Sequence, residues 1–179
     1  MRIISGLLKG RKITPPSGIK SRPTTDFAKE GLFNILNNEF EYEGKNILDL
    51  FAGTGSISFE FISRGVELVW CVEKDRKSAA FIQRFSEINQ LENIKIIKAN
   101  VFSFLRHCKI NFDLIFADPP YAMPNLSELP DKIFRSNLLT EKGLVIIEHG
   151  PDTDFSKSLH FKFHRNYGNV NFSFFKLSE

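Results

Sequence analysis

Cysteine, tryptophan and long apolar runs are all scarce in this sequence of 179 residues, which has 2 Cys and 1 Trp. Cys71 and Cys108 cannot build a disulfide framework, and they show no metal-ligand spacing. The longest unbroken apolar run, Leu68–Val72, is far shorter than the roughly 20 residues that cross a bilayer. The N-terminus, Met-Arg-Ile-Ile-Ser-Gly, lacks the apolar core of a signal peptide. We therefore expect a soluble, cytoplasmic protein with reduced thiols and no membrane contact.

The net charge is also small, at +3, but it is unevenly distributed. Residues 1–30 hold seven basic and two acidic residues, which gives this segment a charge of +5. The other 149 residues hold 17 basic and 19 acidic residues, a net of −2. Such asymmetry indicates an anionic partner for the N-terminal segment, although a solvated basic tail would have the same composition.

The length and the hydrophobic fraction of 42% indicate one domain with a buried core. From residue 46 onward, short β-rich runs alternate with stretches compatible with helices. Buried parallel strands are continuous apolar runs, so this alternation predicts a doubly wound α/β sheet with right-handed crossovers. The expected strands are 46–51, 68–73, 94–98, 112–117 and 143–148, and the expected helices are 56–64, 76–90, 101–107 and 126–137.

The N-terminal part departs from this alternation. Residues 2–5 and 11–14 are β-like and separated by glycines, which predicts a small hairpin. A helix is expected over residues 27–38, with Asp26 as its N-cap. The apolar face of that helix would be formed by Ala28, Leu32, Ile35 and Leu36.

The C-terminal part also differs. Residues 159–165 and 170–174 alternate apolar and polar side chains, which predicts an antiparallel hairpin closing one edge of the sheet. The sequence is rich in phenylalanine, with 19 residues, and the hairpin accounts for part of this excess. Four of these aromatic side chains are expected to pack on one face as cross-strand pairs, namely Phe161, Phe163, Phe172 and Phe174.

The first motif that carries chemistry spans residues 47–58, Ile-Leu-Asp-Leu-Phe-Ala-Gly-Thr-Gly-Ser-Ile-Ser. Gly53 and Gly55 let the backbone turn tightly and approach a ligand closely. A nucleotide-type cofactor would lie across the carboxyl ends of the strands, as it does in open α/β sheets. Glu73 ends the next strand, where a carboxylate can accept hydrogen bonds from both ribose hydroxyls.

Asp49 distinguishes between the cofactors that such a loop could bind. The dinucleotide fingerprint needs a third small residue, and Ser58 stands in that place. An acidic residue inside the strand is unfavourable near a pyrophosphate but favourable near the sulfonium and amino groups of S-adenosylmethionine. We therefore favour S-adenosylmethionine over NAD. A turn that binds no ligand is the structural alternative, because it would also use a pair of glycines.

The second motif is Asp118-Pro119-Pro120-Tyr121, which follows the apolar run 112–117 directly. It is expected at the same edge of the sheet as the glycine loop, because both follow parallel strands. The prolines stiffen the loop. Asp118 and the Pro120 carbonyl can accept hydrogen bonds from an exocyclic amine, and Tyr121 can stack on a planar base. The amine lone pair would then be aimed at a methyl donor. A plain Pro-Pro turn that ends the strand is the structural alternative.

Asp-Pro-Pro-Tyr after such a strand resembles the signature of amino-group methyltransferases that use S-adenosylmethionine. More narrowly, the chain resembles the RsmD family of small-subunit (16S) ribosomal RNA guanine-N2 methyltransferases. The segment Arg-Pro-Thr-Thr-Asp at 22–26 is the more specific part, because generic methyltransferases share only the other two motifs. The resemblance covers nearly the whole chain and includes residues 2–6, 10–12, 22–26, 32–34, 48–55, 73–76, 100, 103–105 and 118–121.

The resemblance implies a Rossmann-like class I methyltransferase fold. This is a mostly parallel seven-stranded α/β sheet with a C-terminal antiparallel hairpin and a short N-terminal hairpin and helix. Residues 1–44 would be the basic extension and residues 45–179 the methyltransferase domain. The catalytic residues would be Asp118, Pro119, Pro120 and Tyr121. The residues that bind S-adenosylmethionine would be Arg22, Thr24, Asp49, Phe51, Ala52, Gly53, Thr54, Gly55, Glu73, Asn100, Val101 and Asp118.

The resemblance also implies ribosomal RNA as partner, within a small subunit or its assembly intermediate. The target base must leave its stack to reach a pocket. Phosphate contacts are independent of sequence and would come from the basic segment. These contacts would be made by Arg2, Lys9, Arg11, Lys12, Lys20 and Arg22.

No metal site is expected, because the four histidines form no ligand spacing. His160 and His164 are expected to face solvent. His149 lies at the end of the fifth strand near the expected site, where it has either a minor functional role or a purely structural one. A small chain without a spare apolar element indicates a monomer.

Two other functions stay open at this point. A DNA adenine-N6 or cytosine-N4 methyltransferase would use the same Asp118 motif, but such enzymes usually carry a separate target-recognition segment. A chain of 179 residues leaves little space for one. A non-catalytic RNA-binding module with this fold would bind RNA without binding the cofactor.

Overall fold

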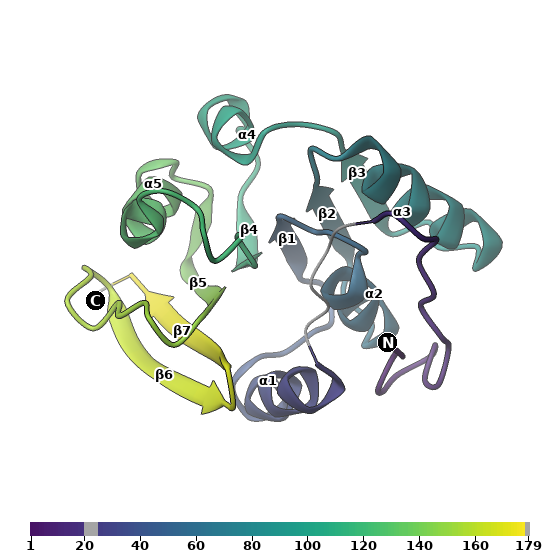
Figure 1. Cartoon of the computed structure of the whole chain (residues 1–179), viewed down its shortest axis with the longest axis horizontal. Helices are drawn as coiled ribbons and strands as arrows, with labels where there is room; N and C mark the ends of the chain where they lie inside the picture. Colours follow the sequence, from purple (N-terminus) through teal and green to yellow (C-terminus); the bar gives the residue numbers. More distant parts are fainter. Residues whose placement is uncertain (20–24, 178–179) are drawn as a thin grey trace.

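A computed structural model describes residues 1–19 and 25–177, and within them a seven-stranded sheet forms the centre of the molecule (Figure 1). The strand order is β3-β2-β1-β4-β5-β7-β6. The first five of these strands are parallel, and β7 is antiparallel to both β5 and β6. The strands are β1 (Asn46–Leu50), β2 (Leu68–Val72), β3 (Ile94–Ile97), β4 (Phe112–Ala117), β5 (Leu139–His149), β6 (Phe161–Tyr167) and β7 (Val170–Lys176).

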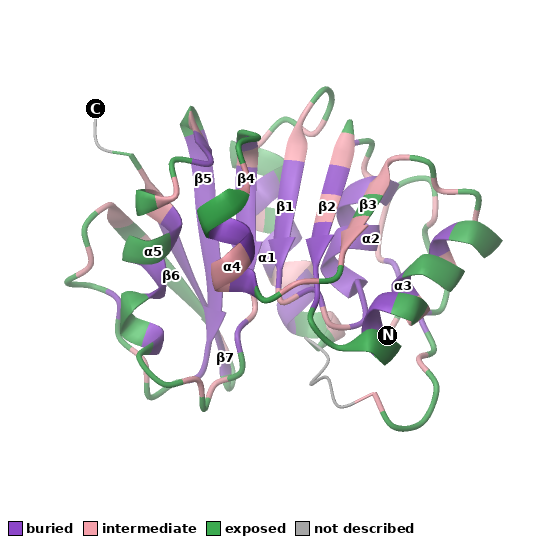
Figure 2. Ribbon diagram, turned by 90° about the horizontal axis from the view of Figure 1, so that it is seen from above, coloured by how far each residue is buried: buried purple, intermediate pink, exposed green. Residues whose placement is uncertain are grey.

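Helices cover both faces of the sheet, so its central strands are buried (Figure 2). Successive residues of a strand point to opposite faces, and Ile47 and Leu48 accordingly belong to two separate core clusters. The cluster with Ile47 includes side chains of α1, α2 and α3, and that with Leu48 includes side chains of α4 and α5. The helices are α1 (Asp26–Glu39), α2 (Ser56–Ser63), α3 (Arg76–Ile88), α4 (Val101–His107), the 3-10 helix η1 (Leu126–Glu128) and α5 (Leu129–Arg135).

The predicted alternation of strands and helices is confirmed, with differences at element ends. β5 begins at Leu139 rather than at residue 143, because Leu139 already pairs with Phe112 before the register shifts. The helix expected over 126–137 is divided into η1 and α5, and Pro130 lies in the first turn of α5. Proline is tolerated there because the first turn of a helix needs no donor from it.

The N-cap of α1 is Thr25 rather than Asp26, so that prediction is wrong. The Thr25 hydroxyl accepts a hydrogen bond from the backbone N–H of Ala28 at 3.1 Å, the contact that a cap makes three residues ahead. Asp26 is the first helical residue, and its carboxylate is stabilised there by the positive end of the helix dipole. The buried face also contains Lys29 and Phe33, whereas Ile35 is only half-buried.

The phenylalanines of the C-terminal hairpin lie on both faces of the sheet, so the expectation of one shared face is wrong for Phe161. Phe163 stacks on Phe174 with ring centroids 4.5 Å apart, on the face covered by α1. Phe161 packs instead against Phe175, at 5.8 Å, on the opposite face. The register between β6 and β7 shifts between Phe161 and Phe163, and such a bulge moves a side chain to the other face.

The N-terminal hairpin is confirmed. The N–H of Ile3 donates to the Arg11 carbonyl at 3.0 Å, and the N–H of Gly10 donates to the Ile3 carbonyl at 2.8 Å. Ile3 and Ile13 are fully buried in the same cluster as α1, α2 and the sheet. The hairpin is therefore held against the sheet core by apolar contacts. No helix in the described ranges is long and apolar enough to cross a membrane.

Candidate functional site

A cavity of about 900 Å³ opens at the carboxyl ends of the parallel strands. It lies where β1 and β4 are neighbours and the chain crosses over in opposite directions, the usual ligand site of an open α/β sheet. Its volume lies within the roughly 300–1,000 Å³ range of small-molecule sites. The cavity brings together twelve predicted site residues from the carboxyl ends of β1 to β4 and the segments that follow them, namely Asp49, Phe51, Ala52, Gly53, Thr54, Glu73, Asn100, Val101, Asp118, Pro119, Pro120 and Tyr121.

The loop after β1 turns tightly because three of its residues have positive φ. Phe51, Gly53 and Gly55 have φ values of 62°, 56° and 74°. Gly55 does not line the cavity itself but is the N-cap of α2, and a Cβ there would lie 2.9 Å from the Phe59 ring. Glycine is therefore required at position 55 by both backbone conformation and packing.

Glu73 joins the loops that follow β1 and β2. One of its carboxylate oxygens accepts a hydrogen bond from the N–H of Gly53 at 2.8 Å, and the other accepts one from the N–H of Asp75 at 2.7 Å. Each carboxylate oxygen can accept more than one hydrogen bond. The buried carboxylate is thus held in place while its oxygens can still accept hydrogen bonds from a pair of hydroxyls in the cavity.

Asp49 is fully buried at the base of the cavity. Burial raises the pKa of its carboxyl to about 7, the Ser58 hydrogen bond opposes this shift, and the neighbouring Glu73 charge adds to it. The Ser58 hydroxyl donates to Asp49 at 2.5 Å. Because a nearby cation favours the charged form of a carboxyl, this position suits a positively charged ligand group.

Cys71 lies behind Ser58 and donates from its thiol to the Ser58 hydroxyl at 2.9 Å. Burial raises the pKa of this thiol far above its ordinary value, so the nucleophilic thiolate is not accessible. Cys108 caps the C-terminal end of α4 and does not line the cavity.

Asn100 forms the part of the cavity wall that follows β3. Its side-chain oxygen accepts hydrogen bonds from the N–H groups of Phe102 and Ser103, at 3.0 and 3.2 Å, and thereby caps α4. Val101 and Phe102 add apolar side chains to the same wall. This wall therefore combines a fixed polar group with a surface suited to a planar ring.

The Asp118 loop forms the opposite wall. The N–H of Asp118 donates to the Leu50 carbonyl at 3.3 Å, which ties the loop to β1. The Pro120 carbonyl accepts a hydrogen bond from the N–H of Met123 at 2.8 Å, so one of its two acceptor positions is already used. The hydroxyl of Tyr121 donates to the buried Glu148 carboxylate at 3.2 Å.

The predicted RNA-binding residues of the hairpin do not line the cavity. Arg2, Lys9, Arg11 and Lys12 are exposed, and none of them lines it. The hairpin tip contacts Ser63 at the end of α2, and helical geometry places that residue about 10 Å from the start of α2 at the cavity. Lys20, Arg22 and Thr24, the other predicted residues of this segment, lie outside the described residues.

The histidines are not part of the cavity lining. His149 is buried, its ring nitrogens lie 2.8 Å from the Ser173 hydroxyl and 2.9 Å from the Gly150 carbonyl, and burial lowers its pKa. His164 is exposed as expected, but His160 is half-buried against the Phe134 ring, 4.4 Å away, so its prediction is wrong. Among the described residues, no group of three or more His, Cys, Asp or Glu side chains could hold a metal ion.

Several lining residues were not predicted from the sequence. These residues include Gly18, Ser56, Ile57, Val72, Lys74, Asp75, Lys77, Ser78, Phe116 and Met123. A position just after a strand end or at the start of the next helix is the signal that could have identified six of them, Ser56, Ile57, Lys74, Asp75, Lys77 and Ser78. Val72 and Phe116 lie within strands, and Gly18 and Met123 lie in loops without such a signal.

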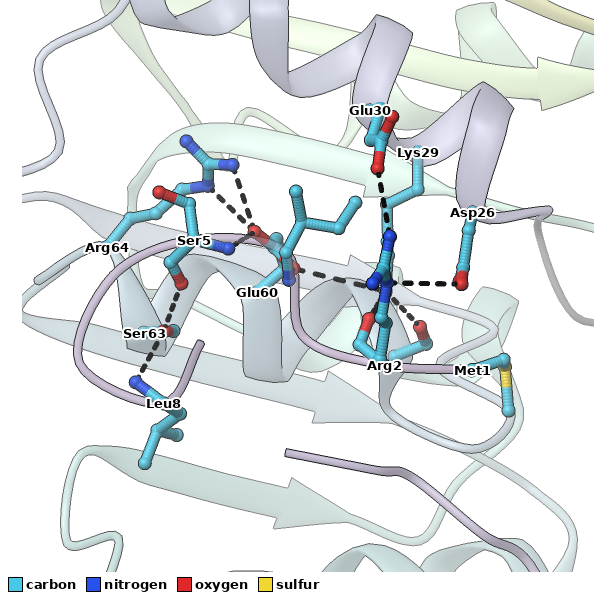
Figure 3. Close-up of polar contacts among 12 residues, drawn as sticks. Met1, Arg2, Ser5, Leu8, Asp26, Lys29, Glu30, Glu60, Ser63 and Arg64 are labelled. Atoms are coloured by element: carbon cyan, nitrogen blue, oxygen red, sulfur yellow. Dashed lines mark hydrogen bonds and ion pairs between the residues drawn. The ribbon is translucent and has the colours of Figure 1, made fainter. Parts of the chain in front are cut away.

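The N-terminal hairpin is attached beside the cavity by two buried charged residues that the sequence analysis also missed (Figure 3). Lys29 donates to the Arg2 carbonyl at 2.6 Å and to the Ser56 hydroxyl at 3.1 Å. Glu60 lies 3.9 Å from the Lys29 ammonium and accepts hydrogen bonds from the N–H groups of Ile4 and Ser5, at 2.7 and 3.1 Å. The two charges thus hold the chain's first residues against α1 and α2.

Comparison with known proteins identifies relatives over the whole of this architecture. The family described as conserved hypothetical protein 95 matches residues 1–176. Ribosomal RNA small subunit methyltransferase D of Buchnera aphidicola (subsp. Acyrthosiphon pisum) is 35% identical over 147 residues, which cover 82% of this chain and 76% of the relative.

Solved structures show the same similarity. The structure of the hypothetical protein TTHA0928 of Thermus thermophilus superposes with a TM-score of 0.87 at 27% identity and covers 99% of both chains. SMU.776, crystallised in complex with SAH, superposes with a TM-score of 0.66 at 19% identity, over 83% of this chain and 49% of that one, which establishes a shared fold only. The fold is that of the class I S-adenosylmethionine-dependent methyltransferases. The chain belongs to the conserved hypothetical protein 95 family, which is the RsmD family that its motifs resemble.

Proposed function

We propose that this protein transfers a methyl group from S-adenosylmethionine to the exocyclic N2 amine of a guanine in small-subunit ribosomal RNA. The observation that carries the proposal is one cavity that joins the Asp118 loop to the buried carboxylates of Asp49 and Glu73. Family membership supports the RNA substrate, because relatives in this family are named ribosomal RNA small subunit methyltransferase D.

The residues of the cavity fit the cofactor. Glu73 would accept hydrogen bonds from the ribose hydroxyls with the acceptor positions that Gly53 and Asp75 leave open. Asp49 would lie near the sulfonium and amino groups, where its negative charge is favourable. Val101 and Phe102 would border the adenine ring. When bound, the cofactor supplies an electrophilic methyl group on a positively charged sulfur.

The Asp118 loop would position the amine of the target base. Asp118 and the remaining acceptor position of the Pro120 carbonyl would accept hydrogen bonds from the amine, and Tyr121 would stack on the base. The carboxylate of Asp118 would also stabilise the positive charge that develops on the nitrogen. Neither cysteine is placed as a nucleophile, and direct transfer needs no covalent intermediate with the protein.

Nucleoside analysis tests this function directly. Small subunits and their purified RNA would be incubated with the protein and methyl-labelled S-adenosylmethionine, then digested to nucleosides. We expect labelled N2-methylguanosine. Methylation of duplex DNA but not of RNA would contradict the proposal in favour of a DNA methyltransferase. RNA binding without heat of cofactor binding in calorimetry would favour a non-catalytic module instead.

The substitution Glu73→Gln is expected to weaken S-adenosylmethionine binding by about 10- to 100-fold, because hydrogen bonds to a charged group contribute roughly 1.5–3 kcal/mol. Calorimetric titration with the cofactor would measure this change. Glu92→Gln, on an exposed residue outside the cavity, is the matched control and should bind like the wild type. A Glu73→Gln protein with wild-type affinity would remove Glu73 from the cofactor site.

Cofactor affinity is expected to rise with pH because burial raises the pKa of Asp49 to about 7. Below this pKa, the free protein holds a proton on Asp49 that a cationic ligand must displace. Affinity should therefore fall by about tenfold for each pH unit below pH 7, until the pKa of the complex is reached. Asp49→Asn should bind more weakly at pH 8 and lose this part of the pH dependence. Equal slopes for Asp49→Asn and the wild type would contradict the prediction.

A further inference from the structure

A second, smaller groove of about 410 Å³ lies between α1 and the end of β6. None of the residues that line it also lines the larger cavity. Its walls carry aromatic, amide and apolar side chains rather than a cluster of charges. The lining residues are Phe27, Glu30, Gly31, Asn34, Ile35, Asn38 and Tyr167.

Two aromatic rings are held at the surface of this groove. Phe27 is 67% exposed, and its ring meets that of Tyr167 edge to face at 5.7 Å. Tyr167 lies so close to α1 that a Cβ on Gly31 would be 2.1 Å from its ring. Glycine is unfavourable inside a helix, so its presence here is explained by the space that Tyr167 needs. The buried residues of α1 do not include Phe27, so its ring contributes to the groove rather than to the core.

The groove begins beside the candidate active site. Tyr167 leads into β7, whose Asn171 pairs with His149 at the carboxyl end of β5. The next residue, Gly150, lies against Tyr121 of the Asp118 loop. On the other wall, Lys29 follows Phe27 by two residues and donates to Ser56 of the cavity. The two hollows therefore lie along the same edge of the sheet.

Charge on the α1 side of β6 suits a nucleic acid. Arg165 is exposed, and its guanidinium lies 4.7 Å from the centroid of the Phe163 ring. Its register partner is Phe172, whose side chain lies in the core cluster beneath α1. Glu30 is the one acidic residue of the described lining, and Arg2 lies 3.7 Å from its carboxylate and offsets the charge.

We propose that this groove binds the single-stranded nucleotides that flank the target guanine, an inference that rests on the proposed function. A base that leaves its stack exposes the faces of its neighbours, and proteins hold such bases on aromatic rings and guanidinium planes. Phe27 and Tyr167 supply the rings, and Arg165 supplies a cation for stacking or phosphate binding. The amides of Asn34 and Asn38 can donate to and accept from base edges.

The test compares Phe27→Ala with Ile88→Ala. Both side chains are 67% exposed, and Ile88 is the last residue of α3, far along the chain from the groove. Fluorescence anisotropy would measure the affinity for a single-stranded oligoribonucleotide that contains the target guanine, and methyl transfer would give KM for small subunits. We expect Phe27→Ala to lower the affinity for the oligoribonucleotide and to raise the KM for small subunits, each by about 5- to 100-fold, because a stacked base contributes that much to binding. Cofactor affinity should not change, and Ile88→Ala should match the wild type in all measurements.

Salt titration provides a second measurement. Arg165→Gln is expected to lower the slope of log affinity against log salt concentration by about 0.7, the value for one phosphate contact to a single strand. An unchanged slope together with unchanged affinity in Phe27→Ala would overturn the proposal. An effect of Phe27→Ala on assembled subunits but not on the oligoribonucleotide would also overturn it, because the groove would then bind a protein. If Phe27→Ala weakens RNA binding but the wild type transfers no methyl group, the proposed function fails and the groove remains an RNA-binding surface.

Discussion

Replacing Asp118 with alanine is expected to reduce the rate of methyl transfer by about 10²- to 10³-fold, the usual effect of removing one group that stabilises developing charge. The side chain lines the cavity and is only partly buried. The backbone N–H of residue 118 would still donate to the Leu50 carbonyl, so the loop keeps its tie to β1. The loss should therefore appear in kcat.

Single-turnover transfer to small subunits, with saturating cofactor, would measure this effect. Asp118→Asn keeps an acceptor oxygen but lacks the charge, so its rate should lie between those of the wild type and Asp118→Ala. Asp152→Ala changes an exposed aspartate outside the cavity and should react like the wild type. Undiminished methylation by Asp118→Ala would mean that the Asp-Pro-Pro-Tyr loop does not hold the amine.

Replacing Glu60 with alanine is expected to lower the free energy of unfolding by about 3–5 kcal/mol, because it leaves a buried charge without its partner. Lys29 is fully buried, and desolvation lowers its pKa while the Glu60 charge opposes that shift. Arg64 also donates to Glu60, at 2.9 and 3.1 Å, and the N–H groups of Ile4 and Ser5 would lose their acceptor (Figure 3). A domain with a typical stability of about 5–15 kcal/mol loses a large part of it in this way.

Denaturant unfolding followed by circular dichroism would measure the loss, and hydrogen exchange would locate it. We expect the amides of Ile4 and Ser5 to exchange faster in Glu60→Ala than in the wild type, because the hairpin loses its anchor. Glu67→Ala, at an exposed glutamate outside this network, is the control and should change stability by less than about 0.5 kcal/mol. A similarly small change in Glu60→Ala would show that apolar packing alone holds the hairpin.

Most of the cavity residues could be predicted from the sequence because the patterns that mark them involve only neighbouring residues. The loop after β1 has its glycines where the backbone needs positive φ, and the Asp118 loop directly follows a continuous apolar strand. Parallel strands end at one edge of the sheet, so motifs after β1, β2 and β4 must meet there. The hydrogen-bond partners of these motifs could not be predicted in this way. Glu73 accepts a hydrogen bond from the N–H of Gly53, and Tyr121 donates one to the carboxylate of Glu148. Both contacts join segments that are distant in sequence, so no local pattern predicts them.

Errors at particular residues have physical causes. Both Thr25 and Asp26 are good capping residues, and only the start of the helical backbone distinguishes them. Phe161 fits the alternation of its strand, but a bulge before Phe163 reverses the face on which it lies. A lysine is normally expected on the solvent-exposed face of a helix. Lys29 can be buried because its ammonium group contacts the Arg2 carbonyl, the Ser56 hydroxyl and the Glu60 carboxylate.

The sequence by itself determined the order of the elements, the class of fold and the two motifs of the site, because hydrophobic periodicity, glycine positions and the stiff proline loop act over a few neighbouring residues. The tertiary structure alone decided where the basic hairpin lies and how Lys29 and Glu60 attach it. It also decided that Phe27 and Tyr167 meet at the surface. These features depend on contacts between segments far apart in the chain, which no local pattern records.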